Sequence, residues 1–255
     1  MAFDGSVALV TGAASGMGRL SAQRLAAAGA QVAAVDVSED ALAALAAQDD
    51  RIHAHPCDVS DSRAVEALVA RVESELGPLD RVMSAAAIAP SGLLVEQDPE
   101  LVVRMMHINY GGVVNLAYAV LPRMLERRRG ELVNFGSLAG WLPSTYTGAY
   151  SATKFAVNSF SEVLWHENRN TGVKILCVCP PVVETPMLGQ MIGRAHDMLQ
   201  DAPRIQPEEV LDAIEEGLEQ GRLWVFPGRG TTAAWRIRRW FPGLLWKRIH
   251  SASGI

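Results

Sequence analysis

The feature that most constrains the fold of this chain is a regular alternation of short apolar segments with longer segments rich in alanine and leucine. Short runs rich in β-branched residues are typical of strands, and the longer segments carry apolar residues at helical spacing. Strands that are apolar throughout are buried on both faces, as in a parallel sheet covered by helices. The alternation therefore predicts an α/β fold, a doubly wound parallel sheet of about seven strands with helices on both faces. The expected strands are Val7–Thr11, Val32–Asp36, Ile52–Cys57, Arg81–Ala85, Glu131–Ser137, Lys174–Cys179 and Leu223–Phe226, and the expected helices lie near Gly16–Ala28, Glu39–Ala47, Ser62–Leu76, Glu100–Arg128, Tyr150–Asn168 and Pro207–Gln220.

The composition indicates one globular domain, residues 1–230, followed by a tail, residues 231–255. Of the 255 residues 49% are apolar, and no linker or repeat interrupts them. The net charge of −5 gives no general attraction for nucleic acid, and no His or Cys at ligand spacing accompanies the three cysteines, so we expect no metal site. The N-terminal segment lacks the basic region of a signal peptide, and no apolar run approaches the ~20 residues that cross a bilayer. A cytoplasmic location is therefore expected.

A glycine-rich turn joins the first expected strand to the first expected helix. Small residues permit a tight turn and let a pyrophosphate approach the N–H groups at a helix N-terminus. Turns collect glycine for other reasons as well, but this placement favours dinucleotide binding in a Rossmann fold. The residues expected to contact a dinucleotide in this turn are Gly12, Ser15, Gly16, Met17 and Gly18.

Asp36 ends the second expected strand and bears on the choice of dinucleotide. A carboxylate there can accept hydrogen bonds from both ribose hydroxyls of an adenosine, and it would repel a 2′-phosphate. Ser15 and Val37, the nearby positions that could offer a competing cation, are neutral. The pattern predicts NAD rather than NADP, with the alternative that Asp36 only caps the next turn.

Tyr150 and Lys154 lie four residues apart and therefore on one face of a helix. A tyrosine has a reference pKa near ~10, and an ammonium group held nearby favours the phenolate and lowers that value. Alone, such a pair is more often a solvated helix face. Ser137 ends a strand at the sheet edge where ligands bind in this fold, so its hydroxyl can orient a carbonyl oxygen. Asn109 either anchors a water in a proton relay or is an ordinary polar residue in a bent helix.

These motifs together resemble the classical short-chain dehydrogenase/reductase family. The resemblance rests on Thr11-Gly12-x-x-x-Gly16-x-Gly18, Asp58-Val59, Asn109, Ser137 and Tyr150-x-x-x-Lys154, in order and over residues 5 to 226. It implies that Tyr150 is the general acid/base, Lys154 the ribose anchor that tunes its pKa, Ser137 the substrate-orienting donor and Asn109 the holder of the relay. It implies further that residues 1–230 form the dinucleotide-binding catalytic domain and that the enzyme is a homodimer or homotetramer. The cofactor contacts that it implies beyond the glycine turn and Asp36 are Asp58 and Val59 at the adenine, and Ala85, Ala86, Tyr150, Lys154, Pro180, Val183, Thr185 and Met187.

Two departures from the family pattern stand out. Ser84-Ala85-Ala86-Ala87 replaces the usual Asn-Asn-Ala-Gly, and we expect Ser84 to supply only part of the hydrogen bonding that the asparagines provide. Pro180-Pro181 replaces Pro-Gly, and because proline fixes φ, the path of the following loop is expected to differ.

The substrate loop, at about residues 185–204, is rich in methionine and leucine. Such residues suggest an apolar, adaptable pocket for a hydrophobic secondary alcohol or ketone of steroid, terpenoid, aryl or alkyl type. The alternative, nearly as strong, is that these side chains merely pack the loop. The expected pocket residues are Ser137, Ala139, Trp141, Pro181, Met187, Leu188 and Met191.

The last 36 residues differ in charge from the rest of the chain. They contain seven Lys or Arg and no Asp or Glu, against 16 basic and 28 acidic residues elsewhere. Residues 231–250 also carry three tryptophans and a phenylalanine, a composition that matches helices lying on anionic lipid. Packing of these aromatics on the domain or on another subunit is favoured, because Pro242-Gly243 would leave two short helices. A cover for the apolar pocket is a third use.

Three rival functions remain open at this point. An NADPH-dependent carbonyl or acyl-chain reductase would share the fold. A nucleotide-binding regulator would share it without catalysis, although all four catalytic residue types are present. An extended sugar epimerase would need a longer chain.

Overall fold

The computed structural model describes residues 3, 5–190, 202, 204–241 and 243. The strands of its main sheet are β1 (Val7–Thr11), β2 (Gln31–Asp36), β3 (Ile52–Pro56), β4 (Arg81–Ser84), β5 (Gly130–Phe135), β6 (Val173–Val178) and β9 (Trp224–Val225). The helices are α1 (Gly16–Ala27), α2 (Glu39–Ala46), α3 (Ser62–Glu75), α4 (Pro99–Met106), α5 (Gly112–Arg127), α6 (Gly148–Glu167), α8 (Pro207–Glu219) and α9 (Thr231–Trp240).

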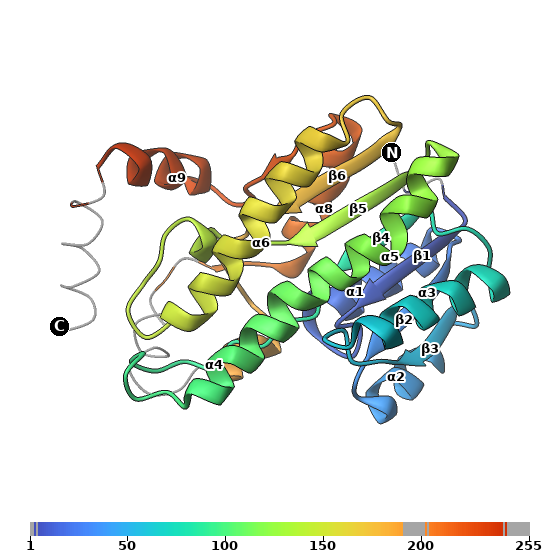
Figure 1. Ribbon diagram of the computed structural model, residues 1–255, viewed down its shortest axis with the longest axis horizontal. Coiled ribbons are helices and arrows are strands. Elements are labelled where there is room, and N and C mark those ends of the chain that lie inside the picture. Colours follow the sequence, from blue (N-terminus) through green and yellow to red (C-terminus); the bar gives the residue numbers. More distant parts are fainter. Residues whose placement is uncertain (1–2, 4, 191–201, 203, 242, 244–255) are drawn as a thin grey trace.

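All seven strands are parallel, in the order β3-β2-β1-β4-β5-β6-β9 (Figure 1). The order reverses direction between β1 and β4, which defines the crevice where ligands bind in doubly wound sheets. The predicted Rossmann fold with about seven strands in a single domain is confirmed.

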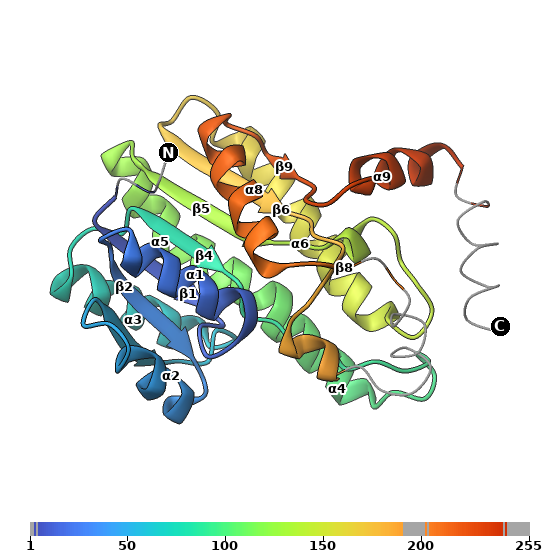
Figure 2. The same ribbon diagram turned by 180° about the vertical axis from the view of Figure 1, so that it is seen from behind.

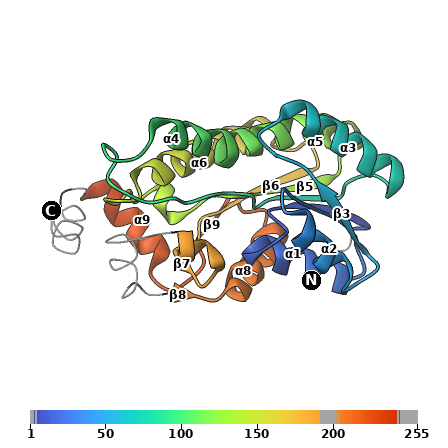
Figure 3. The same cartoon turned by 90° about the horizontal axis from the view of Figure 1, so that it is seen from below.

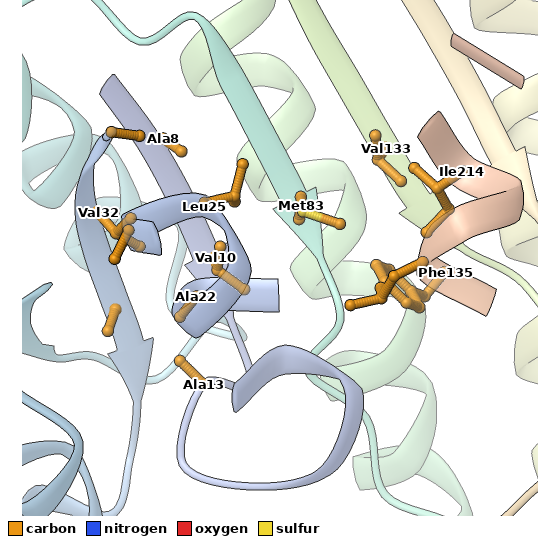
Figure 4. Close-up of a cluster of buried hydrophobic side chains, with 14 of the residues drawn as sticks. Ala8, Val10, Ala13, Ala22, Leu25, Val32, Met83, Val133, Phe135 and Ile214 are labelled. Atoms are coloured by element: carbon orange, nitrogen blue, oxygen red, sulfur yellow. The ribbon is translucent and has the colours of Figure 1, made fainter. Parts of the chain in front are cut away.

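Helices cover both faces of the sheet, as Figure 3 shows: α3, α4, α5 and α6 lie on one side, and α1, α2 and α8 on the other. The strands feed both layers alternately because successive side chains point to opposite faces. In β1, Ala8 and Val10 join the cluster beneath α1 and α8, whereas Val7 and Leu9 join the cluster beneath α3 and α5. The first cluster is drawn in Figure 4. Burial of both strand faces explains why these segments are continuously apolar.

The prediction of one uninterrupted helix over Glu100–Arg128 is wrong, because a π-helical turn, η1 (His107–Gly111), separates α4 from α5. Asn109 lies in this turn with its side chain fully buried. Gly112 follows, and an added Cβ there would lie 2.6 Å from Val59, so the helix can approach Val59 only with glycine at this point. Single π-turns of this kind are frequent at functional sites.

Smaller elements occupy the connections that follow β5 and β6. A 3-10 turn, η2 (Leu138–Gly140), follows β5, and β7 (Val182–Val183) pairs with β8 (Arg204–Ile205) as a separate two-stranded sheet. The 3-10 turn η3 (Pro186–Gln190) begins the loop between β7 and β8. Within the described residues no helix is long and apolar enough to span a bilayer.

Candidate active site

Helix α6 presents one polar face toward the carboxyl ends of β5 and β6. Tyr150, Lys154 and Asn158 are spaced at four-residue intervals and therefore share that face. The Lys154 Nζ atom donates to the Phe135 carbonyl oxygen at 2.7 Å and lies 5.7 Å from the centroid of the Tyr150 ring. The pair therefore projects into the sheet edge and not into solvent, and the alternative of a solvated helix face is excluded.

Ser137 sits two residues beyond the end of β5, and the predicted strand Glu131–Ser137 is two residues too long. Its Oγ atom caps η2 by accepting from the Ala139 N–H at 3.0 Å, and its side chain is hydrogen-bonded to the phenol of Tyr150. Asn158 holds the same segment, with its Nδ2 atom donating to the Ser137 carbonyl at 3.4 Å and its Oδ1 atom close to the thiols of Cys177 and Cys179. Asn158 thus fixes the turn that carries Ser137 against β6.

Burial shifts the pKa values of Tyr150 and Lys154. It raises the pKa of Tyr150 to about 12, and the hydrogen bond from Ser137 opposes the rise. It also lowers the pKa of Lys154 to about 8. The sequence predicted a lowered pKa for Tyr150, and this is wrong for the chain by itself, since desolvation of the phenolate outweighs an ammonium whose proton is donated to the Phe135 carbonyl.

Asn109 joins the π-turn to two neighbouring segments. Its Nδ2 atom donates to the Ile88 carbonyl at 2.8 Å and to the Thr153 hydroxyl at 3.1 Å, and its Oδ1 atom accepts from the Ile88 N–H at 2.8 Å. Thr153 in turn donates to the Tyr150 carbonyl at 2.8 Å. The amide is therefore engaged in fixing α6 against the loop after β4, and a role for Asn109 in a proton relay stays a prediction.

The glycine turn fits the pyrophosphate of a dinucleotide. Gly12 and Gly16 have φ values of 68° and 51°, and an added Cβ on Gly12 would lie 2.9 Å from the backbone of Ala86. A Cβ on Gly18 would lie 2.2 Å from the Gly12 carbonyl oxygen, so all three positions require glycine. The first turn of α1 has no acidic residue and no side-chain cap from Ser15, which leaves its N–H groups to an anion.

Asp36 lies beside the glycine turn at the end of β2. Its Oδ2 atom accepts from the Ala14 N–H at 3.1 Å, and its Oδ1 atom accepts from the Ser38 N–H at 3.2 Å. The carboxylate is partly exposed, so it also keeps lone pairs for further donors. The geometry thus combines the capping role that the sequence left open with a position next to the turn where an adenosine ribose would lie.

Asp58 and Val59 follow β3 on the same edge of the sheet. The Asp58 carboxylate accepts from the N–H and the hydroxyl of Ser60, at 2.9 and 2.7 Å, and so closes a local turn. Val59 is buried, and its carbonyl accepts from the Asn115 Nδ2 atom at 2.8 Å. Asn115 on α5 is a supporting residue that the sequence reasoning missed, because nothing along the chain links it to Val59.

The segment after β4 departs from expectation at Ser84. Its hydroxyl is buried and hydrogen-bonds to no other described residue, so Ser84 supplies none of the bonding that we expected from it. Thr11 supplies hydrogen bonding to this segment instead. Its Oγ1 atom accepts from the Ala86 N–H at 3.2 Å and lies 3.4 Å from the Met83 carbonyl oxygen. Ala85 and Ala86 are thereby held against the glycine turn.

The segment after β6 passes close to both the glycine turn and the catalytic turn. The Pro180 carbonyl accepts from the Leu138 N–H at 2.9 Å, which ties this segment to the turn that carries Ser137. On the other side, an added Cβ on Gly16 would lie 3.6 Å from Thr185. The Pro180-Pro181 departure therefore leaves the connection between the two halves of the site in place.

One cavity of about 730 Å³ unites these elements. It is lined by twelve of the predicted site residues, namely Met17, Ala85, Ser137, Ala139, Tyr150, Lys154, Pro180, Pro181, Val183, Thr185, Met187 and Leu188. Gly12, Ser15, Gly16, Gly18, Asp36, Asp58, Val59, Ala86 and Asn109 lie outside its lining. The residues predicted to be catalytic and to contact the nicotinamide are therefore brought together in one space, whereas those predicted to contact the adenosine lie outside it.

Trp141 does not line the cavity, which corrects its assignment to the substrate pocket. Its ring packs edge-on against Trp224 and Trp235, with centroids 5.1 and 5.7 Å apart. Met191 lies outside the described residues. The cavity is also lined by Gly228, Arg229 and Gly230, which the sequence reasoning missed, and by Thr231 and Ala234 of the tail, for which a cover over the pocket was one of the uses left open. Residues 228–230 follow β9, and the carboxyl end of a parallel strand is where ligands bind in this fold, so their position in the chain could have identified them.

Comparisons with known proteins agree with this geometry. The sequence profile of the short chain dehydrogenase family matches residues 6–194. A 2,3-dihydro-2,3-dihydroxybenzoate dehydrogenase of Bacillus subtilis is 35% identical over 72% of this chain and 72% of its own length.

Solved structures with this fold carry either dinucleotide. A short-chain dehydrogenase/reductase from Burkholderia phymatum in complex with NAD superposes with a TM-score of 0.86, at 26% identity over 96% of both chains. A short-chain dehydrogenase from Sphingobium yanoikuyae in complex with NADPH has a TM-score of 0.81, at 27% identity over 95% of both chains. A nicotinamide dinucleotide is therefore supported as the cofactor, with both forms represented among similar proteins.

Proposed function

The chain is an oxidoreductase of the short-chain dehydrogenase/reductase family, and we propose that it transfers a hydride between NAD(H) and a hydrophobic secondary alcohol or ketone. The observation that carries the proposal is the convergence of Ser137, Tyr150 and Lys154 on one largely apolar cavity beside the glycine turn. A nucleotide-binding regulator would have no use for a phenol hydrogen-bonded to a serine in that cavity.

The roles of the chain's own residues follow from their contacts. Tyr150 takes the hydroxyl proton during oxidation and returns it during reduction, and a positioned acid/base of this kind contributes roughly 10²–10⁴ in rate. Ser137 is hydrogen-bonded to that phenol and would orient the substrate oxygen. Lys154 lines the same cavity, where its ammonium would hold the ribose hydroxyls of the cofactor. The nicotinamide, when bound, carries the hydride.

Asp36 supports NAD over NADP as the cofactor. Its carboxylate accepts from the Ala14 N–H, so it is fixed within the glycine turn and cannot swing away at low cost. A 2′-phosphate at that position would face an unneutralised negative charge, whereas two ribose hydroxyls would be donors to it. A preference for NADP would instead favour the rival carbonyl or acyl-chain reductase.

The lining of the cavity supports a hydrophobic substrate. Its apolar lining includes Leu138, Leu142, Leu188, Ile205 and Ala234. The lining includes charged side chains such as Arg204 and Glu209 and several hydroxyl groups, but most of its surface is apolar, which suits a carbinol better than a sugar. A steroid-, terpenoid-, aryl- or alkyl-carbinol fits the apolar character of the part of this space that the nicotinamide would leave free.

We also propose a homodimer or homotetramer. Val103 on α4 and Phe155 and Val163 on α6 are 53%, 40% and 52% exposed, an apolar group on one helical layer. Sedimentation velocity of the purified chain checks this, and a single monomer peak across the micromolar range contradicts it.

A panel of hydrophobic secondary alcohols, assayed for NADH and NADPH formation, tests the proposed function. We expect NADH formation from at least one aryl or alkyl carbinol, weaker NADPH formation, and rates lower by roughly a hundredfold or more with Tyr150→Phe. Binding of NADH without turnover of any alcohol or ketone would favour the regulator instead.

A further inference from the structure

Helix α9 packs on the domain through one side only. Trp235 stacks on Phe226 with centroids 5.1 Å apart and meets Trp141 edge-on. Thr231, at the start of the helix, is buried and donates to the Pro227 carbonyl at 2.8 Å. The prediction that aromatic residues of the tail pack on the domain therefore holds for Trp235.

The opposite side of α9 is apolar but has no partner among the described residues. Ala233, Ile237 and Trp240 are spaced by four and three residues, which places them on one helix face away from Trp235. Ile237 is 48% exposed, Trp240 is 74% exposed, and Phe241 just beyond the helix is 64% exposed. An exposed tryptophan at the end of a helix, followed directly by an exposed phenylalanine, is unusual for a surface that only meets water.

The exposed Arg236 and the basic composition of the C-terminal segment point to an anionic partner. Arg236 is exposed next to the apolar face, and the whole segment from residue 220 onward carries seven Lys or Arg and no acidic residue. The rest of the chain is acidic, with 28 acidic against 16 basic residues. A second copy of the chain would offer a mostly negative surface, but no apolar layer into which the exposed rings could insert. An anionic bilayer offers both the negative charge and the apolar layer.

The helix is also continuous with the catalytic cavity. Gly230, Thr231 and Ala234 on its inner side belong to the lining. Figures 1 and 2 both show α9 standing off from the body of the molecule at the end toward which the strands point. The same short helix therefore has one side at the cavity and the other exposed.

We infer that the outer face of α9, formed by Ala233, Arg236, Ile237, Trp240 and Phe241, docks on an anionic lipid surface and places the cavity where it can take up a membrane-dissolved substrate. The docking part of this proposal depends only on the exposed residues. The part that concerns uptake of a hydrophobic alcohol rests on the proposed function. Ring systems at headgroup depth and a flanking cation are the two contributions that hold such helices on lipid.

Co-sedimentation of the full chain with phosphatidylcholine vesicles, with and without about one third phosphatidylglycerol, tests docking. We expect binding to the anionic vesicles, weaker binding to the neutral ones, and loss of binding at high salt. The double variant Ile237→Ser/Trp240→Ser should bind at least tenfold more weakly, and Val95→Ser, at a residue 94% exposed in a loop, should bind as the parent does. Arg236→Glu should weaken binding to anionic vesicles severalfold, whereas Arg104→Glu on α4, with the same change in net charge, should not.

Equal sedimentation with and without vesicles, or unchanged binding of the double variant, would overturn the docking proposal. A drop in subunit number in the double variant without any vesicle binding would assign this face to a second copy. Vesicle binding is measured without turnover, so a chain that binds vesicles but oxidises no alcohol refutes the proposed function and leaves docking intact. For uptake, the double variant should lose kcat/KM on a vesicle-borne alcohol and keep it on a water-soluble one; equal losses on both would overturn uptake.

Discussion

Replacing Lys154 by methionine is expected to stabilise the folded protein at neutral pH while removing its activity. Lys154 is 3% exposed, and burial lowers its pKa from 10.5 to about 8. This corresponds to a cost of about 3 kcal/mol for holding the charged form inside the folded protein. Methionine keeps the apolar stem without the charge. Loss of the hydrogen bond to the Phe135 carbonyl offsets about 1–2 kcal/mol, so a net gain of about 1–2 kcal/mol is expected at neutral pH.

The stability difference between the two proteins should also depend on pH. Below about pH 8 Lys154 is protonated in both the folded and the unfolded state, and its full cost is present. Between pH 8 and 10.5 the folded protein has lost this proton while the unfolded chain retains it, so the free energy of unfolding of the parent rises with pH. Across that window the parent gains about 3 kcal/mol relative to Lys154→Met. Because the pKa of Tyr150 is raised to about 12, its phenol stays protonated in the folded state of both proteins across this window and cancels from the difference.

Urea unfolding followed by tryptophan fluorescence, repeated at several pH values from about 7 upward, measures both effects. Lys174→Met is the matched control, because Lys174 lies on β6 with its side chain 51% exposed in an ion pair with Glu131, and its removal should change stability by less than about 1 kcal/mol at any pH. A Lys154→Met protein that is less stable than the parent at neutral pH, or a difference that stays constant up to pH 10.5, would refute the reasoning.

Four further outcomes are expected. Tyr150→Phe should lower turnover by roughly a hundredfold or more with little change in NADH affinity by fluorescence titration, and near-parental turnover would exclude Tyr150 as the acid/base. Asp36→Ala should shift the NAD-to-NADP ratio of kcat/KM toward NADP by roughly tenfold, and an unchanged ratio would remove Asp36 from cofactor selection. Gly12→Ala should cost about 2–4 kcal/mol in urea unfolding, because it adds a backbone clash at 2.9 Å to a positive φ, while Gly221→Ala, with a φ of 62° and open space around it, should cost only about 1 kcal/mol. Asn158→Ala should lower kcat severalfold and leave the Kd of NADH unchanged, since Asn158 holds the Ser137 segment and not the glycine turn; a loss of NADH affinity of the same size would indicate a general structural defect instead.

The polar face of α6 illustrates which contacts the spacing of residues along the chain can predict and which it cannot. Four-residue spacing on a helix places Tyr150 and Lys154 side by side wherever the helix lies, and the resemblance to a known family then gave the pair its predicted catalytic roles. Asn158 continues the same spacing, yet its role depends on contacts with Ser137 and with Cys177 and Cys179 on β6. Those contacts join residues about twenty positions apart, and no local sequence pattern predicts them.

Periodicity and residue size act over a few positions, so the order of the main strands and helices and the glycine turn could be read along the chain, and the family resemblance added the roles proposed for Tyr150 and Lys154. Three other features depend on the folded arrangement: the π-turn at Asn109, the pKa of Tyr150, and the approach of α9 to the cavity. Each of these arises where segments distant in the chain meet. Burial and hydrogen bonding at such meetings depend on all partners together, so they exist only once the sheet has assembled.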